Sequence, residues 1–189
     1  MKPSWKEKLW NAPKAWYYFG IPLGGLVFFI IGVMFLAGFN ASLTATSTEE
    51  FCVSCHGMSE PFKEYKETHH FNSQSGVVAT CVDCHLPKEF VPKMIRKTVA
   101  MREVWHMMLG SINTAEKFEK KRGFLAQRVW DEMKETDSRE CRSCHDQNRW
   151  DLEKQSKRAR KKHDIEDMKK KDKTCIDCHK GLAHKMPKD

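Results

Sequence analysis

No stretch of the chain alternates apolar and polar residues as a half-buried β-strand requires, which argues against a fold built on sheets. Apolar runs are also few beyond residue 40, and charged residues make up 31% of the chain. A segment of that composition buries too little side-chain surface to form a conventional protein core. We therefore expect an irregular all-α fold whose interior is filled by something other than apolar side chains.

Charge is absent from Ala15 to Thr48. Residues 19–39 read FGIPLGGLVFFIIGVMFLAGF, and thirteen of them are Leu, Ile, Val or Phe. At about −0.3 to −0.6 kcal/mol for each central residue, these side chains contribute roughly −4 to −8 kcal/mol to membrane insertion. The sequence predicts a transmembrane anchor helix over residues 17–40. Its apolar core is longer than that of a signal peptide, which favours an anchor over a leader cleaved near NASLTA.

Basic residues ahead of the anchor predict its orientation. Four lysines precede it and are opposed only by Glu7. Flanks rich in lysine stay in the cytoplasm, so we expect residues 1–16 to be cytoplasmic and residues 41–189 to form an exported domain. An exported domain does not meet nucleic acid, and the formal charge of +8 therefore needs another partner, such as membrane lipid or acidic cofactors.

No cysteine is left outside one repeated motif, Cys-x-x-Cys-His. The four copies comprise Cys52, Cys55 and His56; Cys81, Cys84 and His85; Cys141, Cys144 and His145; and Cys175, Cys178 and His179. This is the attachment motif of c-type haem, in which both thiols bind the porphyrin and the histidine faces the iron. Zinc does not require a histidine after every second cysteine, and disulfides would consume the same thiols. We therefore predict four covalently bound haem c groups, which supply the missing core and whose propionates offset the basic excess.

Helical periodicity extends over residues 87–111 and 113–138. We expect the first of these helices to lie close to the membrane surface and Thr114 to cap the second. Residues 149–172 are almost wholly charged and predict a solvated helix. Residues 40–50 read as a short polar tether, in which Ser47 or Thr48 caps the next helix.

The haem motifs fall into two pairs, over residues 52–85 and 141–179, which suggests a duplicated dihaem unit. A glycine pair, Gly20 and Gly24, has the spacing of helix-packing motifs and leaves a homo-oligomer open without predicting one.

Beyond the motifs, the chain resembles the NapC/NirT family of membrane-anchored tetrahaem quinol dehydrogenases over nearly its whole length. The stretches that carry the resemblance are STEEFCVSCHGM, EYKETHH, SGVVATCVDCHLPKEFVPKMIRK, TAEKFEKKRGFLAQRVWDEM, DSRECRSCHD and TCIDCHKGLAHKMP. The resemblance implies a haem-organised multihaem cytochrome c domain in the periplasm, anchored in the bacterial inner membrane.

This resemblance also implies a function. Family members oxidise menaquinol or ubiquinol and pass the electrons to a periplasmic reductase. The NapC-like segment from Thr114 to Trp130 favours nitrate reductase with its dihaem subunit. Relatives with similar haem domains feed nitrite, N-oxide or metal reductases. A different class remains open, a tethered electron carrier without its own quinol site.

Three histidines outside the motifs match iron ligands of the family. By that resemblance His70 reaches haem 4, His184 reaches haem 3 and His163 reaches haem 2, where haems are numbered by motif order. We interpret the remaining two, His69 and His106, as structural.

For haem 1, the resemblance implies that Met58 binds the iron and that His56 is displaced. A thioether is a weak, polarisable donor that raises the potential relative to two histidines, and without a strong ligand the far face stays accessible. The alternative is that His56 binds the iron and Met58 only packs.

Quinol oxidation releases two electrons and two protons, whereas each haem accepts one electron. The site therefore needs a donor to the quinone oxygen and a proton acceptor near the haem closest to the anchor. By resemblance, Lys97 hydrogen-bonds a quinone oxygen and Glu103 accepts a proton. The alternative for both residues is a solvated helix face.

Overall fold

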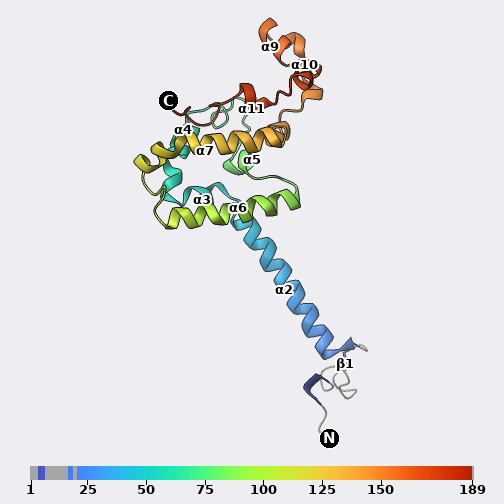
Figure 1. Ribbon diagram of the computed structural model, residues 1–189. Coiled ribbons are helices and arrows are strands. Elements are labelled where there is room, and N and C mark those ends of the chain that lie inside the picture. The colour runs from blue at the N-terminus through green and yellow to red at the C-terminus, as the bar shows by residue number, and fades with distance from the viewer. Residues whose placement is uncertain (1–3, 7–16, 19–20, 189) are drawn as a thin grey trace. The chain divides into compact units, whose positions relative to one another are not determined.

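The computed structural model describes residues 4–6, 17–18 and 21–188, with the side chains of Tyr17, Tyr18, Ile21 and His56 left out. The chain divides into two compact units, Met1–Thr46 and Ser47–Asp189 (Figure 1). Most of the predicted cytoplasmic segment, residues 1–16, lies outside the described residues.

The first unit contains one long helix, α2 (Leu23–Ala45), preceded by a two-residue antiparallel pair, β1 (Tyr17–Tyr18) and β2 (Ile21–Pro22). At about 1.5 Å per residue its 23 residues extend about 34 Å, enough to cross a bilayer core of about 30 Å. It is the only helix in the described part of the chain with the length and hydropathy of a membrane span, and none of its most apolar window is buried.

The boundaries of α2 differ from the predicted span of 17–40. The helix begins later because Pro22 stands at its N-cap, the position where a missing N–H breaks no helical hydrogen bond. It ends later because polar side chains bond the preceding turn: Asn40 donates to the Leu36 carbonyl, and Thr44 donates to the Asn40 carbonyl. Part of the predicted tether is therefore helical.

The second unit is built from short helices around two longer ones. In chain order these are α3 (Glu49–Val53), η2 (His56–Met58), α4 (Ser59–Lys66), α5 (Cys81–His85), α6 (Phe90–Met108), α7 (Ala115–Glu135), α8 (Arg139–Arg142), η3 (Gln147–Arg149), η4 (Leu152–Lys154), α9 (Lys157–Lys162), α10 (Ile165–Lys170) and α11 (Cys175–Cys178). Apart from β1 and β2, the described residues contain no strand. The predicted all-α class is confirmed.

The two long helices lie within the predicted ranges, α6 inside residues 87–111 and α7 inside residues 113–138, and each is a few residues shorter at both ends. Thr48 caps α3 by accepting a hydrogen bond from the Phe51 N–H, and Thr114 caps α7 through the Lys117 N–H. Gly110 stops α6 with φ of +79°, a left-handed conformation that glycine adopts without strain. Around these helices, α11 lies against α7, and α5 lies against α3 and α8 (Figure 1).

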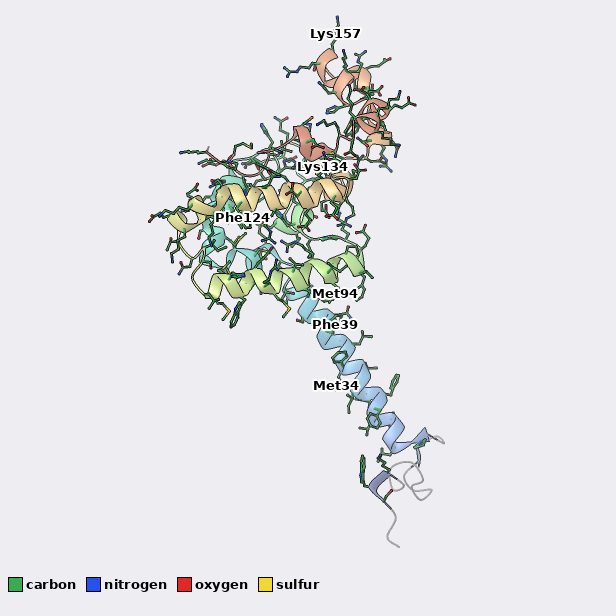
Figure 2. All side chains as sticks on the ribbon, viewed as in Figure 1. Met34, Phe39, Met94, Phe124, Lys134 and Lys157 are labelled. Atoms are coloured by element: carbon green, nitrogen blue, oxygen red, sulfur yellow. The ribbon has the colours of Figure 1, made fainter. Side chains whose placement is uncertain are left out.

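The charged segment 149–172 is not the single solvated helix that its composition predicts. It is broken into η4, α9 and α10, because polar side chains at three points bond backbone N–H groups and start new turns. These caps are Asp151, Ser156 and Asp164. Charged side chains surround the resulting lobe, with Lys157 projecting outward (Figure 2).

Side chains contribute little core to this unit. Among the described residues, the buried apolar side chains are Tyr65, 6% exposed, and two prolines, Pro61 and Pro87. Burial raises the pKa of Tyr65 to about 12, so the hydroxyl stays protonated, and it donates to the Ala79 carbonyl just before the second haem motif. The scarcity of side-chain core agrees with the composition.

A buried ion pair replaces part of that core. Arg122 of α7 makes two hydrogen bonds to Glu64 of α4, at 2.6 and 2.9 Å, and both side chains are 8% exposed. Burial alone would raise the pKa of Glu64, but hydrogen bonds from Arg122 and from the Lys185 N–H outweigh it and lower the pKa. The pair thus ties α4, α7 and the C-terminal segment together.

Candidate haem-binding sites

Each haem motif lies on or beside one short turn of helix. In the second and fourth motifs a reciprocal capping box starts that turn, between Thr80 and Asp83 and between Thr174 and Asp177. In these two motifs both cysteines belong to the same helical turn, and residues three apart on such a turn face the same side. All eight cysteines are within the described residues and none forms a disulfide, which leaves every thiol available.

Three motif histidines each face a second histidine from elsewhere in the chain. The ring centroids of His85 and His184 are 6.2 Å apart, those of His145 and His70 are 6.2 Å apart, and those of His179 and His163 are 5.9 Å apart. The ring planes meet at 25°, 79° and 28° respectively.

These separations are those of two imidazoles bound to opposite sides of one metal ion. A metal–nitrogen bond of about 2 Å plus about 1.1 Å from nitrogen to ring centre gives roughly 6.2 Å between ring centres. Rotation about the metal–nitrogen bond leaves the ligands opposite each other, so near-parallel and near-perpendicular rings both satisfy the geometry. The three pairs therefore fit an iron between them.

The chemistry of the paired nitrogens also fits a metal. His184 Nδ1 is buried and has no hydrogen-bond partner among the described residues. Burial lowers the pKa of His184, and it lowers that of His85 to about 4, so both rings stay neutral and keep a lone pair. Burial also lowers the pKa of His70, with further help from His145.

These pairs differ from those the resemblance implies. His70 lies beside the third motif rather than the fourth, His184 beside the second rather than the third, and His163 beside the fourth rather than the second. Each of the three residues lies beside a motif histidine, in a distribution that differs from the one the resemblance implies. Sequence shows that a spare histidine exists, whereas the motif it faces depends on how distant segments pack. His69 and His106 are exposed.

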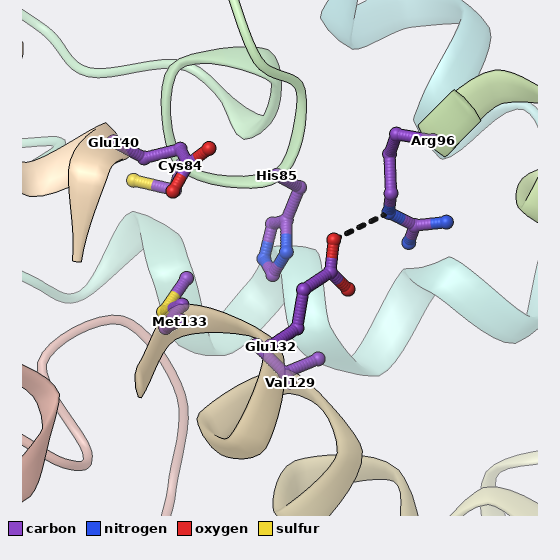
Figure 3. A pocket seen from close by; sticks show the side chains of 7 residues that line it. All are labelled: Cys84, His85, Arg96, Val129, Glu132, Met133 and Glu140. Carbon is purple, nitrogen blue, oxygen red and sulfur yellow. Dashed lines mark ion pairs between the residues drawn. The ribbon is translucent and has the colours of Figure 1, made fainter. Parts of the chain in front are cut away.

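The second motif shows how the long helices frame such a site. The His85 ring points into a pocket between α6, which contributes Arg96, and α7, which contributes Val129, Glu132 and Met133 (Figure 3). Arg96 and Glu132 are 3.7 Å apart and form an ion pair at its edge. Neither residue was singled out from the sequence, because a charged residue on a helix gives no sign of the face it occupies.

The first motif packs against the end of α6. A Cβ on Gly57 would lie 2.6 Å from the Ile112 carbonyl oxygen, so only glycine fits between the motif and this segment. Met58 ends η2, next to Gly57. The side chain of His56 is outside the described side chains, so the choice between Met58 and His56 as ligand remains a prediction.

Lys97 and Glu103 lie on different faces of α6, because six residues turn a helix by about 240° beyond one full turn. Lys97 is close enough to Cys52 for their charges to interact, and this opposes the rise in the thiol pKa that burial causes. Burial lowers the pKa of Lys97. Of the two predicted quinol-site residues, Lys97 is therefore the one brought to the first motif.

Glu103 instead joins α6 to α7. Its carboxylate accepts two hydrogen bonds from Arg96, both 3.2 Å, and lies 3.4 Å from an Arg128 nitrogen. The carboxylate is thus held between two guanidinium groups, one from each helix.

Comparison with known proteins identifies relatives over most of the chain. Residues 17–189 match the profile of the NapC/NirT cytochrome c family, N-terminal region. The denitrification system component NirT of Stutzerimonas stutzeri is 48% identical over 168 residues, 87% of this chain and 83% of the relative. The cytochrome c-type protein NapC of Escherichia coli strain K12 is 44% identical over 187 residues, 98% of this chain and 92% of the relative.

A third relative is longer. The cytochrome c-type protein TorY of Escherichia coli O157:H7 is 43% identical over 168 residues, which are 86% of this chain but 45% of TorY. No solved structure matches.

Proposed function

Because the chain belongs to the NapC/NirT cytochrome c family, we propose that it oxidises menaquinol or ubiquinol and passes the electrons to a periplasmic reductase. Family membership makes it an electron-transfer cytochrome with covalently bound haem c, and α2 gives it the segment for a membrane anchor. The quinol, the reductase and the periplasmic orientation are the proposed steps. The lysine-rich flank ahead of α2 supports an N-terminus in the cytoplasm.

The observation that carries the proposal is the set of three imidazole pairs. In the proposed protein the four cysteine pairs would hold the haems, and His85 with His184, His145 with His70 and His179 with His163 would bind the irons of haems 2, 3 and 4. When bound, the haems supply one-electron redox chemistry. Two strong ligands close an iron to other molecules, so these three centres suit electron transfer rather than substrate binding.

The first motif is the proposed point where electrons arrive from quinol. Met58, which follows the motif in η2, is the proposed ligand of haem 1. Lys97 supports this placement because its ammonium group lies near Cys52. We expect Lys97 to donate a hydrogen bond to a quinol oxygen and to stabilise the negative charge that develops as protons leave.

For Glu103 the ion pairs favour a supporting role. By holding Arg96 and Arg128, Glu103 fixes α6 on α7 and thereby keeps Lys97 beside the first motif. The proton acceptor proposed from the resemblance is therefore the weaker of the two assignments, and a Glu103→Gln variant tests it directly.

The outward face of α6 supports a position at the membrane surface. Ion-paired Arg96 points inward, with 17% of its side chain exposed, whereas large apolar residues point out. The exposed set comprises Phe90, Val91, Ile95, Met101, Trp105, Met108 and Leu109. An apolar face rimmed by lysine and containing tryptophan is typical of a helix lying in the bilayer interface.

The partner is proposed from the relatives. NapC-like similarity over nearly the whole chain favours nitrate reductase with its dihaem subunit, whereas the NirT and TorY relatives leave other periplasmic reductases as alternatives. The engagement of Glu103 in ion pairs favours a second candidate, a tethered carrier that receives electrons from another membrane complex.

One experiment separates these two functions. Full-length protein in lipid nanodiscs is mixed with a menaquinol analogue, and haem reduction is followed by absorbance. The proposal expects reduction that a quinone-site inhibitor blocks. No reduction by the quinol, with full reduction by dithionite, would favour the tethered carrier.

A further inference from the structure

The imidazole of His163 is held from two sides by its own segment of chain. Its Nδ1 lies 2.6 Å from the side-chain Oε1 of Gln155, and its ring centroid lies 5.1 Å from that of Trp150. On the remaining side the ring faces His179 of the fourth motif. The hydrogen bond and the ring contact together fix the orientation of the imidazole.

The hydrogen bond fixes which nitrogen of His163 carries a proton. An amide oxygen can only accept, so Nδ1 must be the donor. In a neutral imidazole with Nδ1 protonated, the lone pair is on Nε2, which is the nitrogen then free to bind iron. Gln155 is therefore placed to select the tautomer that suits a metal ligand.

The local fold holds both partners in place. Gln155 closes η4 through a hydrogen bond from its N–H to the Leu152 carbonyl, and His163 closes α9 through a 2.8 Å bond to the Ala159 carbonyl. Between them Ser156 caps α9. Arg160 donates a hydrogen bond to the Glu153 carbonyl, which joins η4 to α9. These hydrogen bonds thus hold η4 and α9 together, with the Gln155 amide at the end of one and the His163 imidazole at the end of the other.

We propose that Gln155 is a positioning residue for haem 4, which orients His163 and strengthens its electron donation to the iron. This inference rests on the proposed ligation of haem 4 by His163 and His179. An acceptor on the outer ring nitrogen makes a histidine a stronger donor, and a stronger donor stabilises the ferric iron. Gln155 therefore lowers the potential of haem 4.

The test uses the full-length protein with its haems attached. In Gln155→Leu, which keeps the bulk and removes the acceptor, we expect the potential of haem 4 to rise and its low-spin EPR signal to shift, while four haems remain bound by mass. The change in the reduction equilibrium should be on the order of tenfold, at the lower end of the range for residues that support a metal ligand. In Gln155→Glu, which offers a stronger acceptor, the potential should fall below that of the unmodified protein.

Two further variants keep the outcomes distinct. Gln127→Leu is the matched control, since Gln127 is exposed on α7 and bonds Asp131, and it should change no haem. In His163→Ala the low-spin signal of haem 4 should be lost, and an unchanged spectrum would refute the ligand assignment. A changed His163→Ala spectrum together with unchanged potentials in both Gln155 variants would overturn the role of Gln155 alone.

Discussion

The first and fourth haem motifs share the pentad Cys-x-x-Cys-His but lie in different surroundings. The fourth faces His163, which is itself fixed by Gln155 and Trp150. The first packs through Gly57 against the end of α6 and has the Lys97 ammonium group nearby. Under the proposed function, the same covalent attachment would serve two purposes. Residues brought from elsewhere in the chain would decide whether a haem becomes a closed relay or a site that a substrate can approach.

Removing a distal histidine should have the largest effect, because a haem iron then loses one of its two proposed histidine ligands and becomes accessible to other molecules. In His184→Ala we expect haem 2 to lose its second strong ligand and become high-spin, with electron transfer through the protein falling by more than about a hundredfold. EPR spin quantitation and stopped-flow reduction measure both effects. His106→Ala, at an exposed histidine, is the control. A high-spin signal from haem 3 instead of haem 2 would contradict the pairing of His85 with His184.

The ion pair of Arg122 and Glu64 should show how the regions are held together. Arg122→Ala leaves a buried carboxylate without its partner, and we expect a loss of about 3–5 kcal/mol in the free energy of unfolding. Lys120→Ala, which breaks an exposed pair with Glu116 on the same helix, should cost under about 1 kcal/mol. Denaturant titration of the haem-loaded protein measures both losses. Equal losses would show that the buried pair stabilises the fold no more than an exposed pair does.

The same pair predicts a pH dependence. The pKa of Glu64 is lowered in the folded protein, so its contribution is fully present above the ordinary value of 4.5 and is lost as the pH falls through the lowered value. Stability of the unmodified protein should therefore decline in acid below about pH 4.5. In Glu64→Gln this part of the decline should disappear from denaturant titrations run at several pH values. If the variant and the unmodified protein lose stability identically in acid, Glu64 does not cause the decline.

Lys97→Gln tests the proposed quinol site at the first haem motif. We expect quinol oxidation to slow by about ten- to a hundredfold, because a neutral amide stabilises developing charge less than an ammonium group does. The spectra of haems 2 to 4 should not change. Lys121→Gln, at an exposed lysine of α7, is the matched control. If both variants oxidise quinol at the same rate as the unmodified protein, Lys97 is not part of the site.

Glu103→Gln should give the smallest effect. The amide still accepts from Arg96, so we expect quinol oxidation to fall by less than about tenfold, through a weaker junction between α6 and α7. Turnover in nanodiscs measures the change. A loss as large as that of Lys97→Gln would restore Glu103 as the proton acceptor.

Local signals accounted for much of the fold. Thr114 and Gly110 mark helix ends because capping and left-handed glycine depend only on neighbouring residues. The motif cysteines were equally plain, since haem attachment fixes their spacing. The break of segment 149–172 into separate turns was not predicted. The side chains of Asp151 and Ser156 can cap a new helix, but they bond backbone N–H groups only where the previous helix has already ended.

Longer-range features could not be predicted. The partner of each distal histidine depends on packing between segments far apart in the chain, so the structure places His70 and His184 beside other motifs than the resemblance implies. The role of Glu103 was obscured for the same reason, since its partner Arg128 is on another helix.

The distribution of ligands is most directly tested by EPR of the oxidised full-length protein in nanodiscs. The account predicts three low-spin irons with two histidines each. One of them should have the large anisotropy of near-perpendicular rings, from the 79° pair at haem 3, and the fourth iron should have a distinct ligand set. Four equivalent bis-histidine irons, or fewer than three, would contradict it.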